Sequence, residues 1–323
     1  MGFIALIFAL LIEQGRPLPP NNRVHRAMVA LADLVRGASD AGERQHGVLG
    51  WLFVAGITVA GVVLIEYLAA LAHPLALFVV HVVILYLTVG FRQFSHAFTE
   101  IQVALASDDT DGARRVLERW LDQSDPHEWS DRPRREAPVN EVCRQAIAHA
   151  LVAAHRHVFG PLFWYLLLPG AIGPVLYRVA ELLARRWGAS VSEGAARVVE
   201  PYGAFATRMY WLIDWLPMRL SAAGFAIVGN FEDAIYCWRG AVAAGTGDDQ
   251  RSLLLASGGG ALGLRIAEPA LEARWAAGDQ GFEWQGAEPD AAGLRSSVGL
   301  VWRSVVLWIS LFAMLTIAAW LGR

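Results

Sequence analysis

The stretch GVLGWLFVAGITVAGVVLIEYLAALA, residues 47–72, decides the fold of this chain. It contains a single acid, Glu66, and no base. A helix of about 20 apolar residues is long enough to cross the hydrocarbon core of a bilayer. His73-Pro74 interrupts the pattern, and a shorter apolar run at 75–90 follows. Because proline ends one helix and readily begins the next, the two runs predict a helical hairpin in a membrane.

Other apolar runs extend this pattern along the chain. Hydrophobic residues make up 55% of the sequence and the mean hydropathy is +0.38, which is too apolar for an ordinary soluble surface. We therefore expect an all-α protein: a polytopic membrane helix bundle with about five spans, proline-broken helices and cytoplasmic helical loops. It would form a single domain over 1–323. The candidate spans are 47–72, 75–90, 158–183, 211–229 and 301–321, with 1–12 as a candidate short anchor.

The distribution of arginine predicts an orientation. The loops 13–46, 91–157 and 230–300 would share one side of the membrane and together hold 19 of the 27 basic residues. The connector 181–210 holds four. The positive-inside tendency then places the three large loops in the cytoplasm of a bacterial cell, with the chain multi-pass in the inner membrane. If the run at 158–183 were re-entrant, everything after it would change sides.

Several function classes are disfavoured by composition. The chain has no lysine, which excludes a Schiff-base lysine and a Walker A loop. Cys143 and Cys237 lie far apart without a C-x-x-C pattern, so we expect neither a disulfide framework nor a zinc site. The net charge of −3 gives no reason to expect a nucleic-acid partner. The N-terminus lacks the basic region and cleavage site of a secretory signal peptide.

Two ionisable residues lie in the first hairpin. Glu66 and His81 stand seven and eight residues from the turn at His73, so they lie at similar depth. Charged groups at such positions are costly and normally face protein partners. We expect an intramembrane polar pair, which serves either as a structural contact or as a proton or ligand site.

The run 211–229 carries Asp214, Pro217 and Arg219. Proline is expected to break this helix and to free backbone carbonyls, which membranes tolerate only against protein or a water-filled cavity. The flanking acid and guanidinium either hold a polar or anionic headgroup or form a plain salt bridge. Arg178, after the proline-interrupted run at 158–183, either joins such a site or extends to the interface.

Two weaker patterns complete the candidates. Residues 257–263, SGGGALG, satisfy G-x-G-x-x-G, but no strand–helix context follows, so a flexible loop or tight helix contact is favoured over a dinucleotide site. His149, His155 and His157 do not share one helical face, and no metal site is expected.

Several motifs resemble a known family. Residues 159–164, FGPLFW, followed by Pro169-Gly170 and by Leu176-Tyr177-Arg178, resemble the APLFW…PGA…YR block of the CobD/CbiB family. Residues 214–220, DWLPMRL, resemble its NWIPARL stretch and, still more closely, the DWxPxRL stretch of AmpE, a relative associated with β-lactamase regulation. Residues 257–265, SGGGALGLR, resemble a glycine-rich block of the CobD side. The resemblance implies a multispan inner-membrane fold. For the CobD/CbiB branch it implies an ATP-dependent adenosylcobinamide-phosphate synthase, which joins aminopropanol or its phosphate to a corrinoid acid.

The chain departs from that family pattern at acidic positions. Gln145, Ala146 and His149 stand where acids precede PLFW, and residues 180–183 replace an NTLD stretch. An ATP-dependent ligation needs carboxylates to hold Mg²⁺. The leading hypothesis is therefore a non-catalytic, AmpE-like signalling or accessory protein. Its candidate ligand-binding residues, expected to line a polar cavity, are Trp164, Arg178, Asp214, Arg219, Asn230 and Arg265.

Two alternatives remain open. One is a diverged adenosylcobinamide-phosphate synthase, for which ATP and Mg²⁺ would be the cofactors. The other is a transporter, suggested only by broken helices and intramembrane charges. The expected partners are the lipid bilayer and a membrane signalling or cobalamin-pathway protein.

Overall fold

The computed structural model describes residues 2–16, 18–19, 22–40, 43–124, 137–188, 200–246, 249–278, 284 and 286–322, with side chains at 91–94 left aside. Within this part of the chain the regular elements are helices, and Leu264 and Ala287 form an isolated bridge. The predicted all-α helical bundle is confirmed. The chain divides into two compact units. Unit 1 comprises Met1–Gln93 and Gly160–Trp215, and unit 2 comprises Phe94–Phe159 and Leu216–Arg323.

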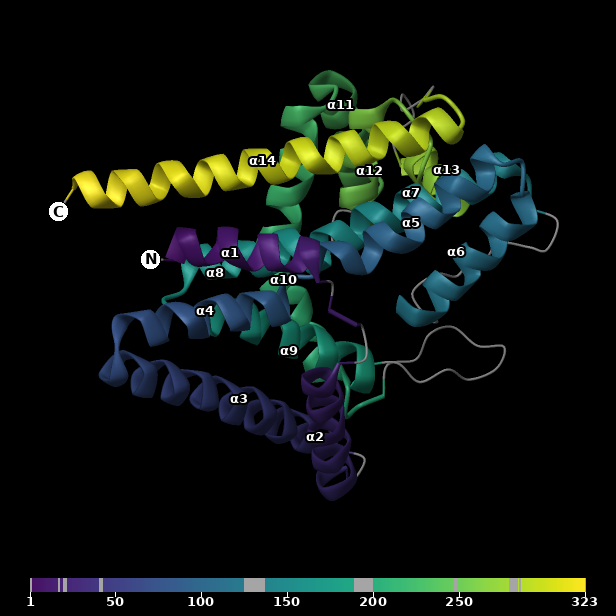
Figure 1. Cartoon of the computed structure of the whole chain (residues 1–323). Helices are drawn as coiled ribbons and strands as arrows, with labels where there is room; N and C mark the ends of the chain where they lie inside the picture. The colour runs from purple at the N-terminus through teal and green to yellow at the C-terminus, as the bar shows by residue number, and fades with distance from the viewer. Residues whose placement is uncertain are drawn as a thin grey trace. The chain divides into compact units, whose positions relative to one another are not determined.

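Unit 1 is built around the predicted hairpin. Its helices are α1 (Gly2–Gly15), α2 (Arg23–Ser39), α3 (Arg44–Ala72), α4 (Pro74–Thr88), α8 (Gly160–Leu167), α9 (Ile172–Trp187) and the first part of α10 (Ala204–Val228). The hairpin turns at His73, whose ring accepts a hydrogen bond from the amide of Leu75, while Pro74 occupies the first turn of α4 (Figure 1). Helix α1 packs against α4, where Phe8 and Phe78 meet edge to face at 5.7 Å.

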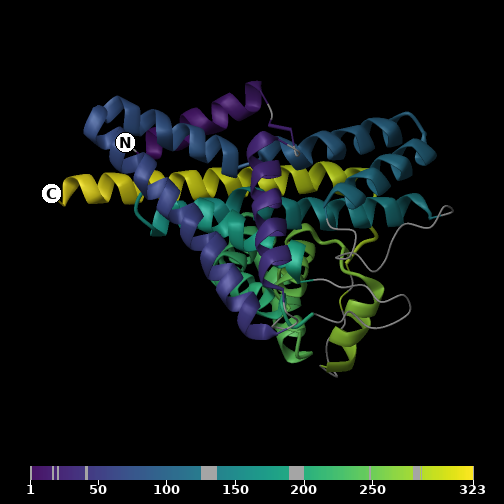
Figure 2. The same cartoon turned by 90° about the horizontal axis from the view of Figure 1, so that it is seen from below.

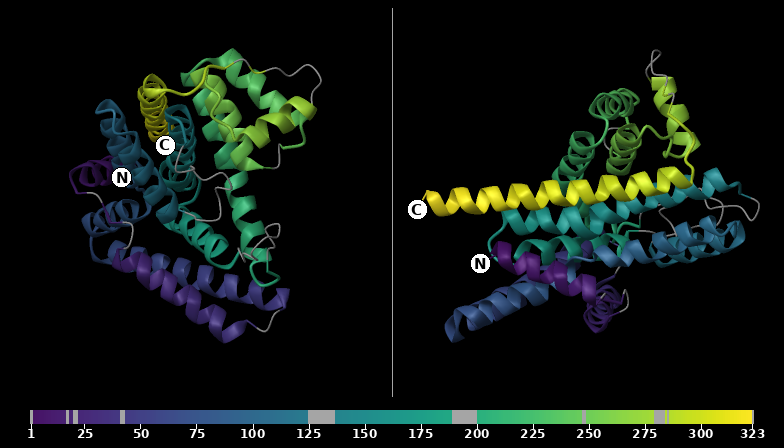
Figure 3. Two further views of the ribbon diagram at one scale, coloured as in Figure 1. Left: turned by 90° about the vertical axis from the view of Figure 1, so that its right-hand side faces the viewer. Right: turned by 45° about the horizontal axis from the view of Figure 1, so that its top comes forward.

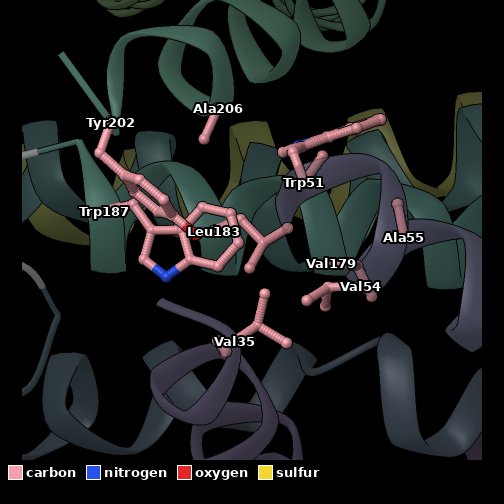
Figure 4. Packing of buried hydrophobic residues seen from close by; sticks show 11 residues of the cluster. Val35, Trp51, Val54, Ala55, Val179, Leu183, Trp187, Tyr202 and Ala206 are labelled. Atoms are coloured by element: carbon pink, nitrogen blue, oxygen red, sulfur yellow. The ribbon is translucent and has the colours of Figure 1, made fainter. Parts of the chain in front are cut away.

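An aromatic core joins α2, α3, α9 and α10 (Figure 4). Trp187 and Tyr202 are fully buried and meet at 5.1 Å between ring centroids. Burying an aromatic side chain of this size contributes a few kcal/mol, on the order of 1.5–3. One bidentate salt bridge, with hydrogen bonds of 2.7 and 2.9 Å from Arg186 to Asp33, links α9 to α2 at the exposed edge of this core. Figure 2 shows α2 and α3 converging at one end of the unit.

Unit 2 surrounds one buried helix. Its elements are α5 (Phe91–Ala106), α6 (Thr110–Ser124), α7 (Val139–Ala154), the π-helical turn η1 (His155–Phe159), the rest of α10, α11 (Phe231–Ala243), α12 (Gln250–Leu262), α13 (Pro269–Gly278) and α14 (Ala291–Leu321). Every residue of α7 from Val142 to Ala154 is buried. Helices α6, α12 and α14 pack against it. Figure 3 shows the long yellow α14 running along α7 and the short helices α11, α12 and α13 grouped together.

Hydrogen bonds and small residues hold that group of short helices. Trp275 of α13 is 2% exposed, and its indole Nε1 donates to Oγ1 of Thr246 at 3.0 Å and to Oγ of Ser252 at 3.2 Å. A Cβ at Gly260 of α12 would overlap the backbone of Asp233 in α11. The absence of a side chain there lets the two helices approach closely.

Three helices in the described part of the chain are long and apolar enough to cross a membrane: Arg44–Ala72, Ala204–Val228 and Ala291–Leu321. They contain the candidate spans 47–72 and 301–321 and all of 211–229 except its last residue. Helices α1 and α4 are apolar but shorter. Large apolar side chains such as Leu52 and Phe53 on α3 and Met314 on α14 are exposed. An exposed apolar surface of this kind is suited to contact with lipid.

The region 158–183 is not one continuous helix. It covers the end of η1, then α8, and then α9. Pro161 cannot donate to the carbonyl of His157 four residues earlier, and the π-helical turn lies at that point in the chain. Gly170 then takes a φ of +68°, a left-handed conformation suited to glycine, between α8 and α9.

Candidate functional site

Unit 1 contains five of the eight candidate residues: Glu66, His81, Trp164, Arg178 and Asp214. Unit 2 contains the other three: Arg219, Asn230 and Arg265. The two groups therefore belong to separate compact units, and each is described in its own surroundings.

Asp214 is the most deeply buried of the candidates, with 1% of its surface exposed. The phenol of Tyr177 donates a hydrogen bond to its Oδ1 at 2.9 Å, and the hydroxyl of Tyr210 lies 3.4 Å from that of Tyr177. A buried carboxylate is stable only when such donors replace water. Tyr177 lies directly against Gly160, where a Cβ would overlap its ring. Gly160, Tyr177 and Asp214 come from the PLFW, YR and DWLPMRL motifs respectively, so the three motifs meet at this point.

The expected break at Pro217 is wrong, because α10 continues through it from Ala204 to Val228. Proline lacks an N–H, so the carbonyl four residues earlier, that of Ile213, loses its helical donor. The indole Nε1 of Trp164 in α8 donates to this carbonyl at 3.2 Å. A side chain thus takes over the lost backbone hydrogen bond, and the helix persists without the predicted interruption.

The structure brings Glu66 and His81 together. Nε2 of His81 lies 3.1 Å from Oε1 of Glu66. The same carboxylate oxygen accepts a hydrogen bond of 2.7 Å from the amide of Ala171, directly after the left-handed Gly170. Glu66 therefore caps the turn that leads into α9, which has no side-chain cap of its own. The hydroxyl of Tyr165 lies 3.4 Å from Nδ1 of His81 and extends this set of contacts.

Arg178 lies beside Tyr177 in sequence but contacts a different group. Its Nη1 is 2.7 Å from Oε2 of Glu181, and Nη1 of Arg185 is 3.6 Å from Oε1 of the same carboxylate. Glu181 is buried, with 4% of its surface exposed. The charged cluster on α9 is therefore separate from the Tyr177–Asp214 contact.

Two of the three candidates in unit 2 have different partners. Asn230 is exposed and caps α11, where its Oδ1 accepts a hydrogen bond from the amide of Asp233 at 3.3 Å. Arg265 is exposed and pairs with Glu272 at 2.6 Å. Arg219 is partly buried on α10. Capping and surface pairing are the contacts that the structure gives Asn230 and Arg265.

The glycine-rich motif lies within a helix. Residues 257–262 belong to α12, and Gly263 ends that helix with a φ of +69°. A dinucleotide loop requires the glycines to precede a helix so that its N-terminus meets the phosphates. The tight helix contact favoured from the sequence accounts for Gly258 and Gly260, which face Leu151 and Asp233.

Two polar contacts of unit 2 were not anticipated. Arg144, 6% exposed, binds Glu141 at 2.6 Å and donates to the carbonyl of Ala267 at 3.1 Å. Desolvation opposes ionisation of Glu141, but the hydrogen bonds and charge of Arg144 outweigh it and lower the pKa of this carboxyl. Nδ1 of the buried His155 lies 2.8 Å from Oγ of Ser221. The spacing of Glu141 and Arg144 by three residues is a signal that the sequence offered for the first contact.

The structure describes a cavity of about 250 Å³ between α5 and α14 in unit 2. Its lining includes Thr99, Gln102 and Arg295 and none of the eight candidate residues. In the described part of the chain, no group of three or more His, Cys, Asp or Glu side chains is placed to hold a metal ion. The candidate polar residues of unit 1 instead take part in separate contacts around Asp214, Glu66 and Glu181.

Comparison with known proteins assigns this architecture to a family. The family model described as CobD/Cbib protein matches residues 3–301. The chain is 29% identical to the cobalamin biosynthesis protein CobD of Stutzerimonas stutzeri (strain A1501), over 95% of each chain. It is 30% identical to the protein of the same name from Chromobacterium violaceum, over 74% of this chain and 71% of that one. No solved structure is significantly similar. The chain therefore belongs to the CobD/CbiB family.

Proposed function

We propose that this chain acts in cobalamin biosynthesis as a diverged adenosylcobinamide-phosphate synthase, which joins aminopropanol or its phosphate to a corrinoid acid. This was the alternative interpretation of the sequence. The two curated relatives are named for cobalamin biosynthesis and neither for regulation, which supports the synthase over the AmpE-like hypothesis. We place the protein in the bacterial inner membrane as a multi-pass protein, supported by its three long apolar helices.

One observation carries the proposal at the level of residues. The buried hydrogen bond between Tyr177 and Asp214 connects two motifs that resemble those of the family. Trp164, from the third motif, donates to the backbone beside Asp214. Motifs far apart in sequence thus meet around one buried carboxylate. Such convergence of polar groups is a common property of functional sites.

The three carboxylates of unit 1 described above do not offer a site for a Mg²⁺–nucleotide. Asp214 is engaged by Tyr177, Glu66 by His81 and Ala171, and Glu181 by two arginines. Magnesium beside a nucleotide is usually held by one or two carboxylates together with the phosphates, and each of these three carboxylates is already engaged in a separate pairing. We therefore derive no step through ATP or Mg²⁺. In this proposal the buried carboxylate of Asp214 acts by holding the hydroxyl of Tyr177 in place.

Complementation tests the proposal. The chain is expressed in a bacterium that lacks its own CobD/CbiB protein and that needs newly made cobalamin for growth. We expect the wild-type chain to restore growth and Asp214→Ala to abolish it, because the buried carboxylate is lost. Asp33→Ala is the matched control, since it removes an exposed carboxylate that pairs with Arg186 on the surface.

Protein in the membrane fraction is quantified by immunoblot for each variant. Wild-type chain that accumulates in the membrane without restoring growth contradicts the synthase. That outcome favours the second candidate function, a non-catalytic accessory protein. The observation that supports this candidate is that Gln145, Ala146 and His149 stand where the family pattern has acids.

A further inference from the structure

The cavity between α5 and α14 in unit 2 contains none of the residues used by the proposed function. Its volume is about 250 Å³, and it is lined by one face of α5 and by the first turns of α14 (Figure 1). Of its lining residues, Leu294 is fully buried, whereas Val103 and Arg295 are exposed, so the cavity opens to the surface. A cavity of about 150 Å³ can hold a benzene molecule. This one therefore has room for a small organic group that enters from outside.

Three polar side chains line this cavity: Thr99 and Gln102 of α5 and Arg295 of α14. Within the described part of the chain, neither Gln102 nor Arg295 has a hydrogen-bond or ion-pair partner. The hydroxyl of Thr99 donates to the carbonyl of Ser95 at 2.8 Å, and its oxygen can still accept a hydrogen bond. The cavity thus offers a guanidinium, an amide and a hydroxyl oxygen to an occupant.

The acids that adjoin the lining residues in sequence are engaged elsewhere. Asp290 caps α14, where its Oδ1 accepts a hydrogen bond of 2.7 Å from the amide of Gly293. The carboxylate of Glu100 on α5 lies 3.0 Å from the ring of His96. Neither acid is paired with Arg295, so the guanidinium gives the cavity a positive charge. Arginine presents a planar set of N–H donors that matches phosphate oxygens, which favours an anionic occupant with a phosphate.

The position of the cavity along α14 indicates a lipid. Arg295 stands six residues before the apolar segment 301–321, a rise of about 9 Å. The headgroup region of a bilayer extends roughly 5–7 Å beyond the hydrocarbon core, and a long arginine side chain can reach it. Trp302 and Val306 follow Arg295 by seven and eleven residues, so all three lie on one face of the helix. Trp302 is 44% exposed and Val306 59% exposed, which leaves an apolar surface leading from the cavity toward the hydrocarbon.

We propose that this cavity binds an anionic phospholipid with hydroxyls on its headgroup, such as phosphatidylglycerol. Arg295 pairs with the phosphodiester, and Thr99 and Gln102 accept hydrogen bonds from the headgroup hydroxyls. One acyl chain then lies along Trp302 and Val306. The inference goes beyond the proposed synthase function, because it concerns how the start of α14 is held at the membrane surface and involves no reaction.

Three probes test the chemistry of the occupant. The purified full-length chain, in dodecyl maltoside, is titrated with dioctanoyl phosphatidylglycerol, with dioctanoyl phosphatidylcholine and with the soluble headgroup glycerophosphoglycerol, and native mass spectrometry measures the bound fraction. We expect phosphatidylglycerol to bind about tenfold more tightly than phosphatidylcholine, whose headgroup is zwitterionic and lacks hydroxyls, and more tightly than the soluble headgroup. Equal affinity for the two lipids overturns the anionic site. A soluble headgroup that binds as tightly as phosphatidylglycerol overturns the assignment of a lipid.

Two arginines of α14 provide a matched pair of variants. Arg295→Gln is expected to weaken binding of phosphatidylglycerol about tenfold, since one charge-assisted contact is lost. Arg303→Gln removes the same charge from an exposed residue of the same helix, whose guanidinium donates to the carbonyl of Gly299 at 3.2 Å and does not line the cavity. It should leave the affinity within about twofold. Equal losses in the two variants would show a nonspecific attraction of charge and contradict the site.

A variant that fills the cavity tests the location without changing any charge. Ala106 lines the cavity and is exposed at the end of α5, so Ala106→Phe adds volume at the surface and should leave thermal unfolding unchanged. We expect it to weaken binding of phosphatidylglycerol about tenfold. Unchanged affinity in this variant would place the lipid elsewhere and contradict the site. Successful complementation by a chain that shows no preference for phosphatidylglycerol would overturn this inference and leave the proposed function intact.

Discussion

At the scale of single residues, Trp164 explains why a proline is tolerated inside α10. Its indole donates to the carbonyl of Ile213, which Pro217 leaves without a helical donor. Trp164→Phe keeps the ring but removes the donor. We expect it to lower the free energy of unfolding by about 1–3 kcal/mol, measured by thermal unfolding in detergent, because a partly buried acceptor loses its hydrogen bond.

The double mutant isolates this contact from general packing. In a Pro217→Ala background the amide of residue 217 can donate to Ile213, so Trp164→Phe should cost much less there. An equal cost in both backgrounds would mean that Trp164 acts only by packing.

Some of these residue contacts could be predicted and others could not. The pairing of Glu66 with His81 follows from their distances to the His73 turn, and the structure brings them together. A sequence also shows that Pro217 frees a carbonyl. It does not show that a tryptophan about fifty residues earlier will satisfy it, because that contact depends on how α8 packs. For the same reason the sequence does not show that Arg265 pairs with Glu272 on the surface.

At the scale of helices, close approach of α11 and α12 depends on glycine. A Cβ at Gly260 would overlap the backbone of Asp233, which cannot move as a flexible side chain can. We expect Gly260→Ala to destabilise the protein by about 1–3 kcal/mol in thermal unfolding, through overpacking. Gly56→Ala on α3 is the matched control. Nothing lies within 4 Å of its Cβ position, so it should be neutral or stabilising by up to about 1 kcal/mol.

Similar losses of stability in both glycine variants would show that α12 does not depend on close packing against α11.

The sequence predicted α3 and α4 well, because long apolar runs separated by His73-Pro74 permit few other arrangements. It was less informative for 158–183 and for the glycine-rich segment 257–263. There the outcome depends on which neighbouring helices supply the missing contacts and hydrogen bonds.

At the scale of the whole molecule, the reactivity of the two cysteines shows whether unit 2 is folded. Cys143 in α7 and Cys237 in α11 are buried and free. Burial raises the pKa of Cys143 to about 11 and that of Cys237 to about 12. Because only the thiolate reacts, we expect negligible alkylation by iodoacetamide at pH 8 until denaturant opens unit 2. Mass spectrometry of intact protein measures the reaction.

Burial of the two thiols also makes the free energy of unfolding depend on pH. The thiols keep their protons in the folded state, whereas the unfolded chain releases them above its pKa of 9.0. Stability should therefore fall as the pH rises from about 9, the pKa of the unfolded thiols, toward about 11 and about 12, their pKa values in the folded protein. Cys143→Ser and Cys237→Ser each reduce that fall. Rapid alkylation of native protein at pH 8 would contradict the buried placement of both helices.

The overall architecture was the most predictable level, since composition and apolar runs already indicate an all-helical membrane bundle. The division into two units was not predicted. Each unit combines two distant segments of the chain, and no local pattern encodes which segments meet.

The most direct test of the account is the fate of the corrinoid acid in the complemented host. Membranes from cells expressing the wild-type chain are supplied with the corrinoid acid, aminopropanol or its phosphate, and ATP, and corrinoids are separated and identified by mass spectrometry. We expect the wild-type protein to convert the acid to its aminopropanol or aminopropanol-phosphate amide, and Asp214→Ala to give no conversion. Unchanged corrinoid acid, with the wild-type protein present in the membrane, would contradict it.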